Sequence, residues 1–408
     1  MTTNFINAAI QTSHDGSMRM IMADYANGAR NTYFMLGPPG VGKTTLGRNL
    51  AEATGLPLVF IHAPTTLPES ISIPVPDHNT GTTRDYINEQ WGLHHDGPVI
   101  LFIDEYTKAS PIVQNILHTA LEHPRRIGNR MLHPDSIVIC TGNNPSVGVG
   151  DVLRAHTRNR VTLINFKSPT AAEWMLWGAG QVHGYVLSFA EQNAGLFLSY
   201  TDPEFQSLDT TDPMRQMVFN PSPDNPARGE SYVSPRSLEA ASNWVWSWER
   251  SQGTAYAMTL DDLTAALQGV IGVPAAEKLK AVIRMGDDVP SPAKIMAHAE
   301  AGTLKGLHRP GIQPAQMMMC LNAPHWLSGA AGGVDKPKTR VEVQQRITAW
   351  FDYMEGGFTV PVISAFLANV QAAASKSVSK ESKIHKLWEV MTTNPNYSAW
   401  ARKYNHII

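Results

Sequence analysis

Residues 33–50 read YFMLGPPGVGKTTLGRNL, an apolar run followed by a glycine-rich turn and then a helical pattern. The segment contains the spacing Gly37-x4-Gly42-Lys43-Thr44. A glycine-rich turn brings backbone N–H groups against phosphate oxygens, and the following helix directs its positive dipole end at the same anion. The spacing, with a strand before it and a helix after it, predicts a phosphate-binding loop of the P-loop type.

Each part of this loop has an expected role. Gly37, Gly40 and Gly42 are expected to let the turn adopt positive φ. Lys43 is expected to reach the β- and γ-phosphates, and the Thr44 hydroxyl to ligate Mg²⁺. We therefore expect ATP and Mg²⁺ as cofactors. The predicted nucleotide-binding residues are Gly37, Pro38, Pro39, Gly40, Val41, Gly42, Lys43, Thr44, Thr45 and Asp104.

Short apolar runs alternate with helical patterns from residue 32 to residue 166. Runs that are continuously apolar and rich in Val, Ile and Phe are typical of strands buried on both faces, as in a parallel sheet covered by helices. We therefore predict an α/β P-loop NTPase core with a five-stranded parallel sheet. The predicted strands are residues 32–36, 57–63, 98–104, 136–142 and 161–166.

The strand pattern stops after residue 166, and helical patterns broken by Pro- and Gly-containing loops follow. We predict three domains. They are an α/β nucleotide-binding core at 1–168, an α-helical lid at 169–287 and an additional helical C-terminal domain at 288–408.

Composition limits the class of protein. Hydrophobic residues make up 43% of the 408 residues and charged residues 17%, which describes a globular chain with real cores. The net charge of −2 gives no bulk attraction to nucleic acid or membrane. Two cysteines, no secretory signal pattern and no apolar run long enough for a membrane span favour a cytoplasmic location.

The strand predicted at 98–104 ends in a pair of acids, Asp104 and Glu105, about 60 residues beyond Lys43. Asp104 is expected to hold Mg²⁺, directly or through water, and Glu105 to polarise the attacking water. Because simple nucleotide binding does not need Glu105, the pair predicts an ATP hydrolase. Thr44 and Asp104 are thus the predicted metal-binding residues.

The strand predicted at 136–142 is followed by two asparagines. Asn143 is predicted to orient the water or the γ-phosphate; Asn144 is the alternative, and a simple Asn-Asn-Pro turn is another.

Arginines provide candidates for contacts with the γ-phosphate. Of the three arginines at 154, 158 and 160, Arg160 is the first candidate and Arg158 the second. A guanidinium stabilises transition-state charge, across a subunit boundary if it cannot reach its own loop. Arg236 is expected near the start of a lid helix, from which it could reach the phosphates. A surface or interface ion pair is the alternative for each of the first three arginines, and an exposed first-turn arginine is the alternative for Arg236.

The order of these motifs resembles the AAA+ ATPases, and within them the MoxR-like group. The resemblance covers residues 20–285. It is carried by GPPGVGKTT (Walker A), ILFIDE (Walker B), CTGNNP (sensor 1), HTRNRV (the arginine-finger region) and SPRS (sensor 2). Residues 65–92 resemble the insertion in the second helix of this clade. Residues 120–143 resemble a β-hairpin before sensor 1, with Gly128 and Asn129 at its turn.

The resemblance implies a homo-oligomeric ring, usually a hexamer, with ATP at the subunit interfaces. It also implies remodelling of a protein substrate, often with a partner that carries a von Willebrand A domain. The sequence departs from the family pattern in two places. Thr107 stands where the family commonly has Asn, and residues 286–408 match nothing recognisable. These departures bear on the expected substrate more than on the expected ATPase activity.

We therefore expect a ring-forming motor that remodels or activates a protein partner. A DNA-directed ATPase of the replication, loader or packaging type, built on the same core, is one alternative. Arginines at 125, 126 and 130 on the expected hairpin could meet an anionic partner or a nucleic-acid backbone, but a solvated surface hairpin is the favoured interpretation. A nucleotide-gated assembly scaffold is the other alternative. Nucleic acid binding is possible but not indicated by the charge.

Overall fold

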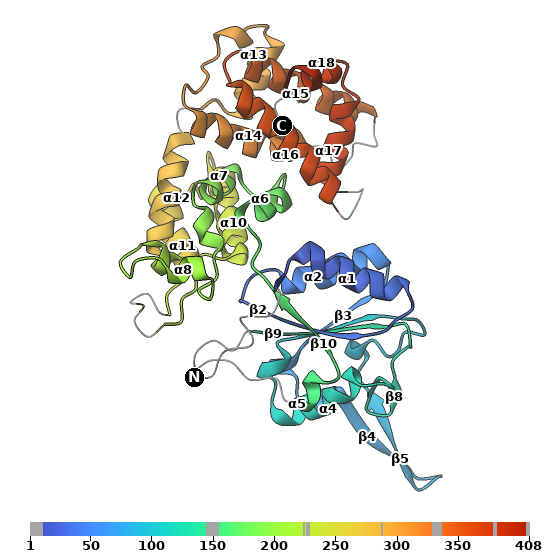
Figure 1. The fold of residues 1–408 in the computed structure, drawn as a ribbon. Coiled ribbons are helices and arrows are strands. Elements are labelled where there is room, and N and C mark those ends of the chain that lie inside the picture. The colour runs from blue at the N-terminus through green and yellow to red at the C-terminus, as the bar shows by residue number, and fades with distance from the viewer. Residues whose placement is uncertain are drawn as a thin grey trace. The chain divides into compact units, whose positions relative to one another are not determined.

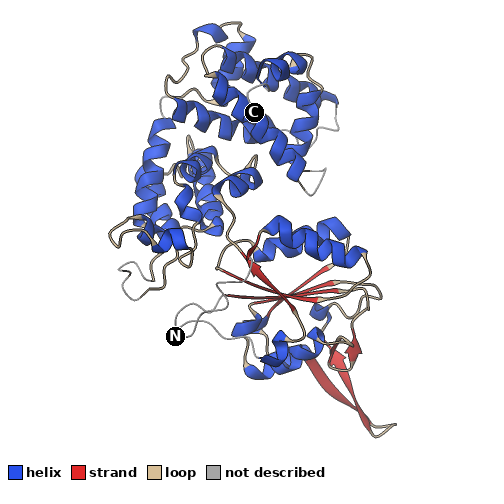
Figure 2. Cartoon of the chain, in the orientation of Figure 1, coloured by secondary structure: helices blue, strands red, loops and turns tan. Residues whose placement is uncertain are grey.

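The computed structural model describes residues 11–143, 155–222, 225, 229–286, 289–328, 337–377 and 382–404. The chain divides into two compact units, Met1–Pro169 and Thr170–Ile408. Among the described residues, all named strands belong to the first unit and the second is built from helices (Figures 1 and 2). Within these ranges no helix is both long and apolar enough to cross a lipid bilayer.

The described strands of the first unit include a six-stranded parallel sheet of order β1-β10-β2-β9-β6-β3. Its strands are β1 (Gln11–Thr12), β2 (Thr32–Gly37), β3 (Leu58–His62), β6 (Ile100–Asp104), β9 (Ile137–Asn143) and β10 (Thr162–Phe166). The five predicted strands are all present. The predicted count was nevertheless wrong, because the sixth strand, β1, lies ahead of the first predicted strand, where no strand was predicted.

The extra strand β1 is short and polar, and it lies at the sheet edge beside β10. Its pairing joins Gln11 to Asn165 and Thr12 to Phe166. Lys167 N–H donates to Thr12 O at 3.0 Å, which continues the ladder. A strand of two polar residues shows no hydrophobic periodicity, so β1 can be recognised only by its pairing with β10.

Helices cover both faces of the sheet (Figure 1). On one face, α1 (His14–Ala26) and α2 (Lys43–Thr54) bury Ile21, Leu46 and Leu50 against the strands. On the other face, α4 (Pro111–Leu121) buries Val113 and Leu117. Burial of each such side chain contributes about 1.5–3 kcal/mol. Apolar strand residues are therefore needed on both faces, which explains the continuous apolar runs.

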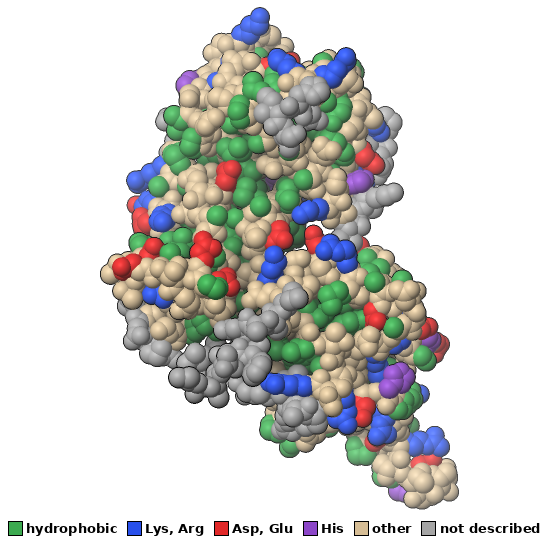
Figure 3. All heavy atoms as spheres, viewed as in Figure 1, with side chains coloured by type: hydrophobic (Ala, Val, Ile, Leu, Met, Phe, Trp, Pro, Cys, Tyr) green, Lys and Arg blue, Asp and Glu red, His purple; other side chains and the backbone are tan. Residues whose placement is uncertain are grey.

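Two antiparallel hairpins accompany the sheet. The first is β4 (Ser72–Asp77) with β5 (Thr82–Ile87), preceded by the short α3 (Pro68–Ile71), and it projects from the first unit (Figure 3). The second is β7 (Arg126–Ile127) with β8 (Arg130–Met131), which confirms the predicted hairpin and its turn at Gly128 and Asn129. The short α5 (Ala155–Arg158) precedes β10.

The second unit is helical in its described part. Its helices are α6 (Ala171–Gly178), α7 (Gly184–Gln192), α8 (Pro203–Gln206), α9 (Met214–Met217), α10 (Pro235–Ser251), α11 (Leu260–Ile271), α12 (Val273–Met285), α13 (Pro292–Glu300), α14 (Gln313–Ser328), α15 (Pro337–Glu355), α16 (Val360–Lys376), α17 (Lys383–Thr392) and α18 (Tyr397–Tyr404).

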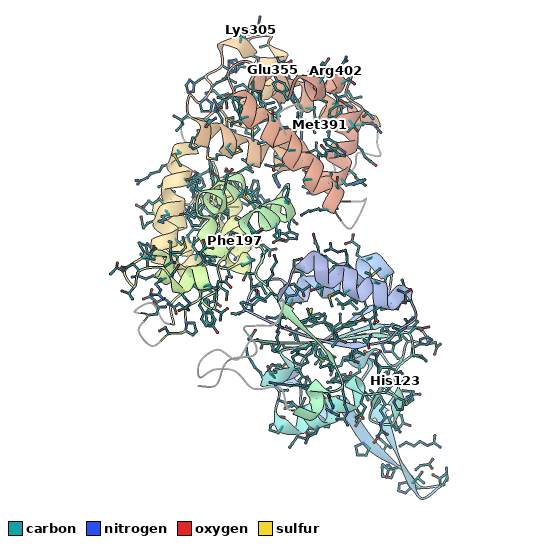
Figure 4. The ribbon with its side chains drawn as sticks, in the orientation of Figure 1. His123, Phe197, Lys305, Glu355, Met391 and Arg402 are labelled. Atoms are coloured by element: carbon teal, nitrogen blue, oxygen red, sulfur yellow. The ribbon has the colours of Figure 1, made fainter. Side chains whose placement is uncertain are left out.

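Two hydrophobic clusters fill this second unit. Phe197 belongs to the cluster around α7, α10, α11 and α12, and Met391 to the cluster around α15, α16 and α17 (Figure 4). Helix α14 serves both, because Met318 and Leu321 join the first cluster whereas Met319 and Cys320 join the second. The two clusters are therefore connected through one helix.

Candidate nucleotide-binding site

Three adjacent strands bring the predicted site residues to one edge of the sheet. Gly37 ends β2, Asn143 ends β9 and Asp104 ends β6, and these strands are neighbours in the order β2-β9-β6. Gly37 and Asn143 are directly paired in the register of β2 and β9. Since the strands are parallel, their carboxyl ends meet at the same edge, which is where open α/β sheets bind ligands.

The loop from β2 to α2 uses its glycines in two different ways. Gly40 and Gly42 have positive φ values of 76° and 92°, as predicted. Gly37 does not belong to the positive-φ residues, so the predicted reason for this glycine was wrong. It is an extended strand residue, and a Cβ at this position would lie 2.5 Å from Phe166 O of β10. Gly37 is required by close strand packing.

Lys43 is the first residue of α2, and its side chain is buried inside the loop. Its Nζ donates to Gly37 O at 2.9 Å and to Pro38 O at 2.7 Å. A third bond joins Nζ to Asn143 Oδ1 at 3.2 Å. The ammonium group is thus held at the mouth of a loop whose N–H groups and helix dipole favour an anion.

The two acids are tied to β9 by a threonine. Thr141 Oγ1 donates to Asp104 Oδ1 at 2.5 Å. The same oxygen accepts the Glu105 N–H at 2.9 Å. Glu105 has φ 54° and ψ 38°, and it is the one non-glycine residue with positive φ in the described part of the chain. This left-handed conformation costs roughly 1–2 kcal/mol for a residue with a Cβ.

The Glu105 carboxylate has two basic neighbours. Lys108 Nζ lies 2.5 Å from Oε1, and His62 Nε2 lies 3.7 Å from Oε2. Lys108 belongs to the short 3-10 turn Tyr106–Lys108 that follows Glu105. His62 ends β3 and is paired in register with Asp104. The carboxylate is therefore flanked by cationic or protonatable groups from two elements.

The predicted Mg²⁺ ligands have the donor chemistry that this ion prefers. Thr44 lies in the first turn of α2 and offers a hydroxyl oxygen, and Asp104 offers a carboxylate; both are partly buried. Mg²⁺ is usually held by one or two such protein oxygens together with waters and substrate phosphates. These residues therefore fit the ion, and Thr44 and Asp104 would hold it.

The two candidate arginines of the first unit lie around α5. Arg160 Nε is 3.0 Å from Glu122 Oε1, and its Nη1 is 3.4 Å from His118 Nε2 of α4. Arg158 ends α5 and is exposed. An ion pair within the chain is thus part of the environment of Arg160, and a role toward a neighbouring subunit stays a prediction. Arg154 and Asn144 lie outside the described residues.

Arg236 belongs to the second unit, at the second position of α10, and is exposed. Ser234 caps this helix in a capping box with Ser237, and Pro235 occupies its first turn. Its predicted approach to the phosphates remains a prediction.

The hairpin arginines differ from one another. Arg126 and Arg130 are exposed, whereas Arg125 is 5% exposed and donates through Nη1 to Ser136 O at 2.8 Å. Its Nη2 donates to Arg30 O. Burial lowers the pKa of the Arg125 guanidinium. Arg125 therefore anchors the hairpin to the rest of the unit and does not point to a partner.

The sequence matches a known family over the part that forms this site. Residues 33–166 match the family described as "ATPase family associated with various cellular activities (AAA)". They form an AAA ATPase domain. The match confirms the predicted P-loop fold class, with the sixth strand as its correction, and the prediction of an ATP hydrolase. No curated protein matches the sequence.

Several solved structures resemble the chain that carries this AAA domain. One is the RuvB Holliday junction branch migration motor of Thermotoga maritima, at 15% identity and a TM-score of 0.33, with 70% of this chain and 74% of that chain covered. Another is NtrX from Brucella abortus in complex with ADP, at 17% identity and a TM-score of 0.34, with 79% and 66% covered.

Sequence reasoning missed Thr141, Lys108 and His62 as neighbours of the acid pair. Thr141 had a visible signal, since it is a hydroxyl residue within the apolar run that forms β9. Lys108 and His62 had none, because their approach to Glu105 depends on the turn after β6 and on the pairing of β3 with β6.

Proposed function

We propose that this protein is a MoxR-like AAA+ motor that uses Mg²⁺-dependent ATP hydrolysis to remodel or activate a protein partner. The observation that carries the proposal is one edge of the sheet, at the carboxyl ends of β2, β9 and β6. There Lys43, at the end of the loop after β2, donates to Asn143, and the Asp104–Glu105 pair follows on the neighbouring strand β6. In this proposal Lys43 binds the phosphates, Asn143 orients them, and Glu105 removes a proton from the attacking water. Mg²⁺ would supply charge neutralisation on the phosphate oxygens.

The assembly in this proposal is a ring, of six subunits by the family pattern. ATP would lie between subunits, with Arg160 or Arg158 of one subunit acting on the nucleotide of the next. Arg236 would act from a lid formed by residues 169–287, and residues 288–408 would be a further helical domain. Each of these assignments is separately testable by substitution.

The hairpins support a mechanical output. The turn of β7–β8 packs on the end of β5, since a Cβ on Gly128 would lie 2.9 Å from Ile87 Cδ1. On the β4–β5 hairpin, Ile73 and Tyr86 are paired in register and are 59% and 61% exposed. An exposed apolar pair on a projecting hairpin is a surface that suits a protein partner, such as a von Willebrand A domain protein or its client.

The decisive test is Glu105→Gln, which keeps the shape of the side chain and removes its basicity. We expect nucleotide binding to persist and kcat to fall by about 10²–10⁴-fold, the usual contribution of a general base. Mass photometry with and without ATP should show ATP-dependent ring formation, and ATP-loaded Glu105→Gln protein should retain its partner in a pull-down. Near-normal turnover of the variant would reject the catalytic assignment.

A DNA-directed motor is the second candidate, favoured by the exposed Arg126 and Arg130 on the β7–β8 hairpin. It predicts ATPase stimulation by single- or double-stranded DNA that is lost steeply as salt rises. Replacing both arginines with glutamine should remove that stimulation and spare the basal rate. An ATPase indifferent to DNA at low salt would exclude the DNA-directed motor.

A further inference from the structure

Thr141 is a fully buried hydroxyl residue at the point where the ladder between β6 and β9 ends. The last pair in the register of these strands is Ile103 with Cys140. Beyond this pair, the Thr141 side chain takes the place of a backbone acceptor and receives the Glu105 N–H at 2.9 Å. Its own proton goes to Asp104 Oδ1 at 2.5 Å. A hydroxyl has one donor hydrogen, so this one is fully committed to Asp104.

The two bonds act on two different properties of the acid pair. The bond to Oδ1 fixes the direction of the Asp104 carboxylate. The bond from the Glu105 N–H holds the peptide from which the Glu105 side chain projects, at a residue whose positive φ is unfavourable for any side chain with a Cβ. Without this bond, the backbone at Glu105 loses an interaction that favours its left-handed conformation.

We propose that Thr141 is a positioning residue for ATP hydrolysis, which aims the Asp104 carboxylate and holds the backbone of Glu105 through one buried hydroxyl. The inference rests on the proposed roles of Asp104 and Glu105 and adds a residue to their site. Thr141 itself does not need to touch the nucleotide. A substitution of Thr141 should therefore lower the rate of the chemical step. ATP affinity should change little, because the loop around Lys43 supplies it.

Thr141→Val tests the proposal because valine keeps the branched shape and removes the hydroxyl. We expect kcat to fall at least tenfold, with the dissociation constant of a fluorescent ATP analogue changed by less than threefold. Thr141→Ser, which retains the hydroxyl, should restore kcat to within threefold of the wild type. Equal losses in the valine and serine variants, or a valine variant within twofold of the wild-type kcat, would overturn the proposal.

A second measurement separates positioning from a general loss of stability. In a Glu105→Gln background, Thr141→Val should lower kcat by less than a further threefold, because the main group that it positions has lost its function. If Thr141→Val lowers kcat by the same factor in the Glu105→Gln background as in the wild type, the proposal is contradicted. If the valine variant does not fold, Thr141→Cys is used in its place, and Thr141→Ser is the size-matched control. The same tenfold difference in kcat is expected between these two variants.

These experiments distinguish a failure of the inference about Thr141 from a failure of the proposed function. If wild-type protein shows no ATPase activity that depends on Glu105, the motor assignment fails and Thr141 positions nothing. If the wild type is active and Glu105→Gln is not, while Thr141→Val retains full kcat, the motor stands and the inference about Thr141 alone is wrong.

Discussion

Lys108 holds the carboxylate of Glu105, with Nζ 2.5 Å from Oε1 across three residues of a 3-10 turn. The pair links the group assigned as general base to a cation from the same turn. While the pair is formed, Oε1 accepts from the ammonium group and is not available to accept a proton from water. The pair therefore opposes proton removal until Glu105 leaves Lys108.

Lys108→Met should raise the basal ATPase rate. Both side chains are partly exposed, at 48% and 30%, and such pairs contribute about 0.2–1 kcal/mol, which corresponds to about 1.5- to 5-fold in rate. A steady-state ATPase assay without partner measures the change, and Lys108→Arg, which keeps the cation, should resemble the wild type. A slower Lys108→Met protein would mean that the lysine assists the reaction.

Lys43→Ala should lose tight ATP binding. Hydrogen bonds to charged groups contribute about 1.5–3 kcal/mol each, so the loss of Lys43 from the phosphates should weaken affinity by about 10- to 150-fold or more. Titration with a fluorescent ATP analogue measures this. Lys108→Met, which removes a cation outside the loop, is the control and should bind normally. Retained affinity in Lys43→Ala would contradict the P-loop assignment.

Arg160→Ala should lower kcat by about 10³-fold or more if this arginine stabilises the transition state of a neighbouring subunit. Mixing it with Lys43→Ala subunits should then restore part of the activity, because each mutant supplies what the other lacks.

Glu122→Gln is the control that the structure provides for Arg160, since Glu122 Oε1 lies 3.0 Å from Arg160 Nε. This variant breaks the ion pair and keeps the guanidinium, so we expect turnover within about twofold of the wild type. Similar losses in Arg160→Ala and Glu122→Gln, without complementation, would indicate that the arginine serves only the ion pair. Complementation by Arg158→Ala would transfer the role to Arg158.

Gly37→Ala should destabilise the first unit through packing. The new Cβ would lie 2.5 Å from Phe166 O, so β2 and β10 must separate. Overpacking of this kind typically costs about 1–3 kcal/mol, which lowers Tm by about 2–12 °C in a unit of this size. Differential scanning calorimetry measures the shift. Gly97→Ala, where a Cβ meets nothing within 4 Å, should leave Tm nearly unchanged.

The features that the sequence predicted correctly are those set by local chemistry. Gly40 and Gly42 supply positive φ, and Gly128 and Asn129 form a two-residue turn. Each depends on residues within a few positions of one another. Patterns of this kind can be recognised without knowledge of the tertiary structure.

The features that were missed depend on pairing between distant segments. Thr141 meets Asp104 because β6 and β9 end in a particular register, and β1 exists only because β10 offers a free edge. Arg125 was taken for a surface hairpin residue, but its guanidinium donates to Ser136 O from inside the unit. Sequence periodicity contains no information about such register, so these contacts required the structure.

Helix α14 contributes neighbouring residues, Leu321 and Cys320, to opposite hydrophobic clusters of the second unit. It is further joined to α7, where Gly184 N–H donates to Asn322 Oδ1 at 3.3 Å. A truncation that ends before α14 would leave the cluster around α7 with uncovered apolar surface and favour aggregation of the shortened chain. Engineering of a minimal version of this protein must therefore keep α14 with the helices that precede it.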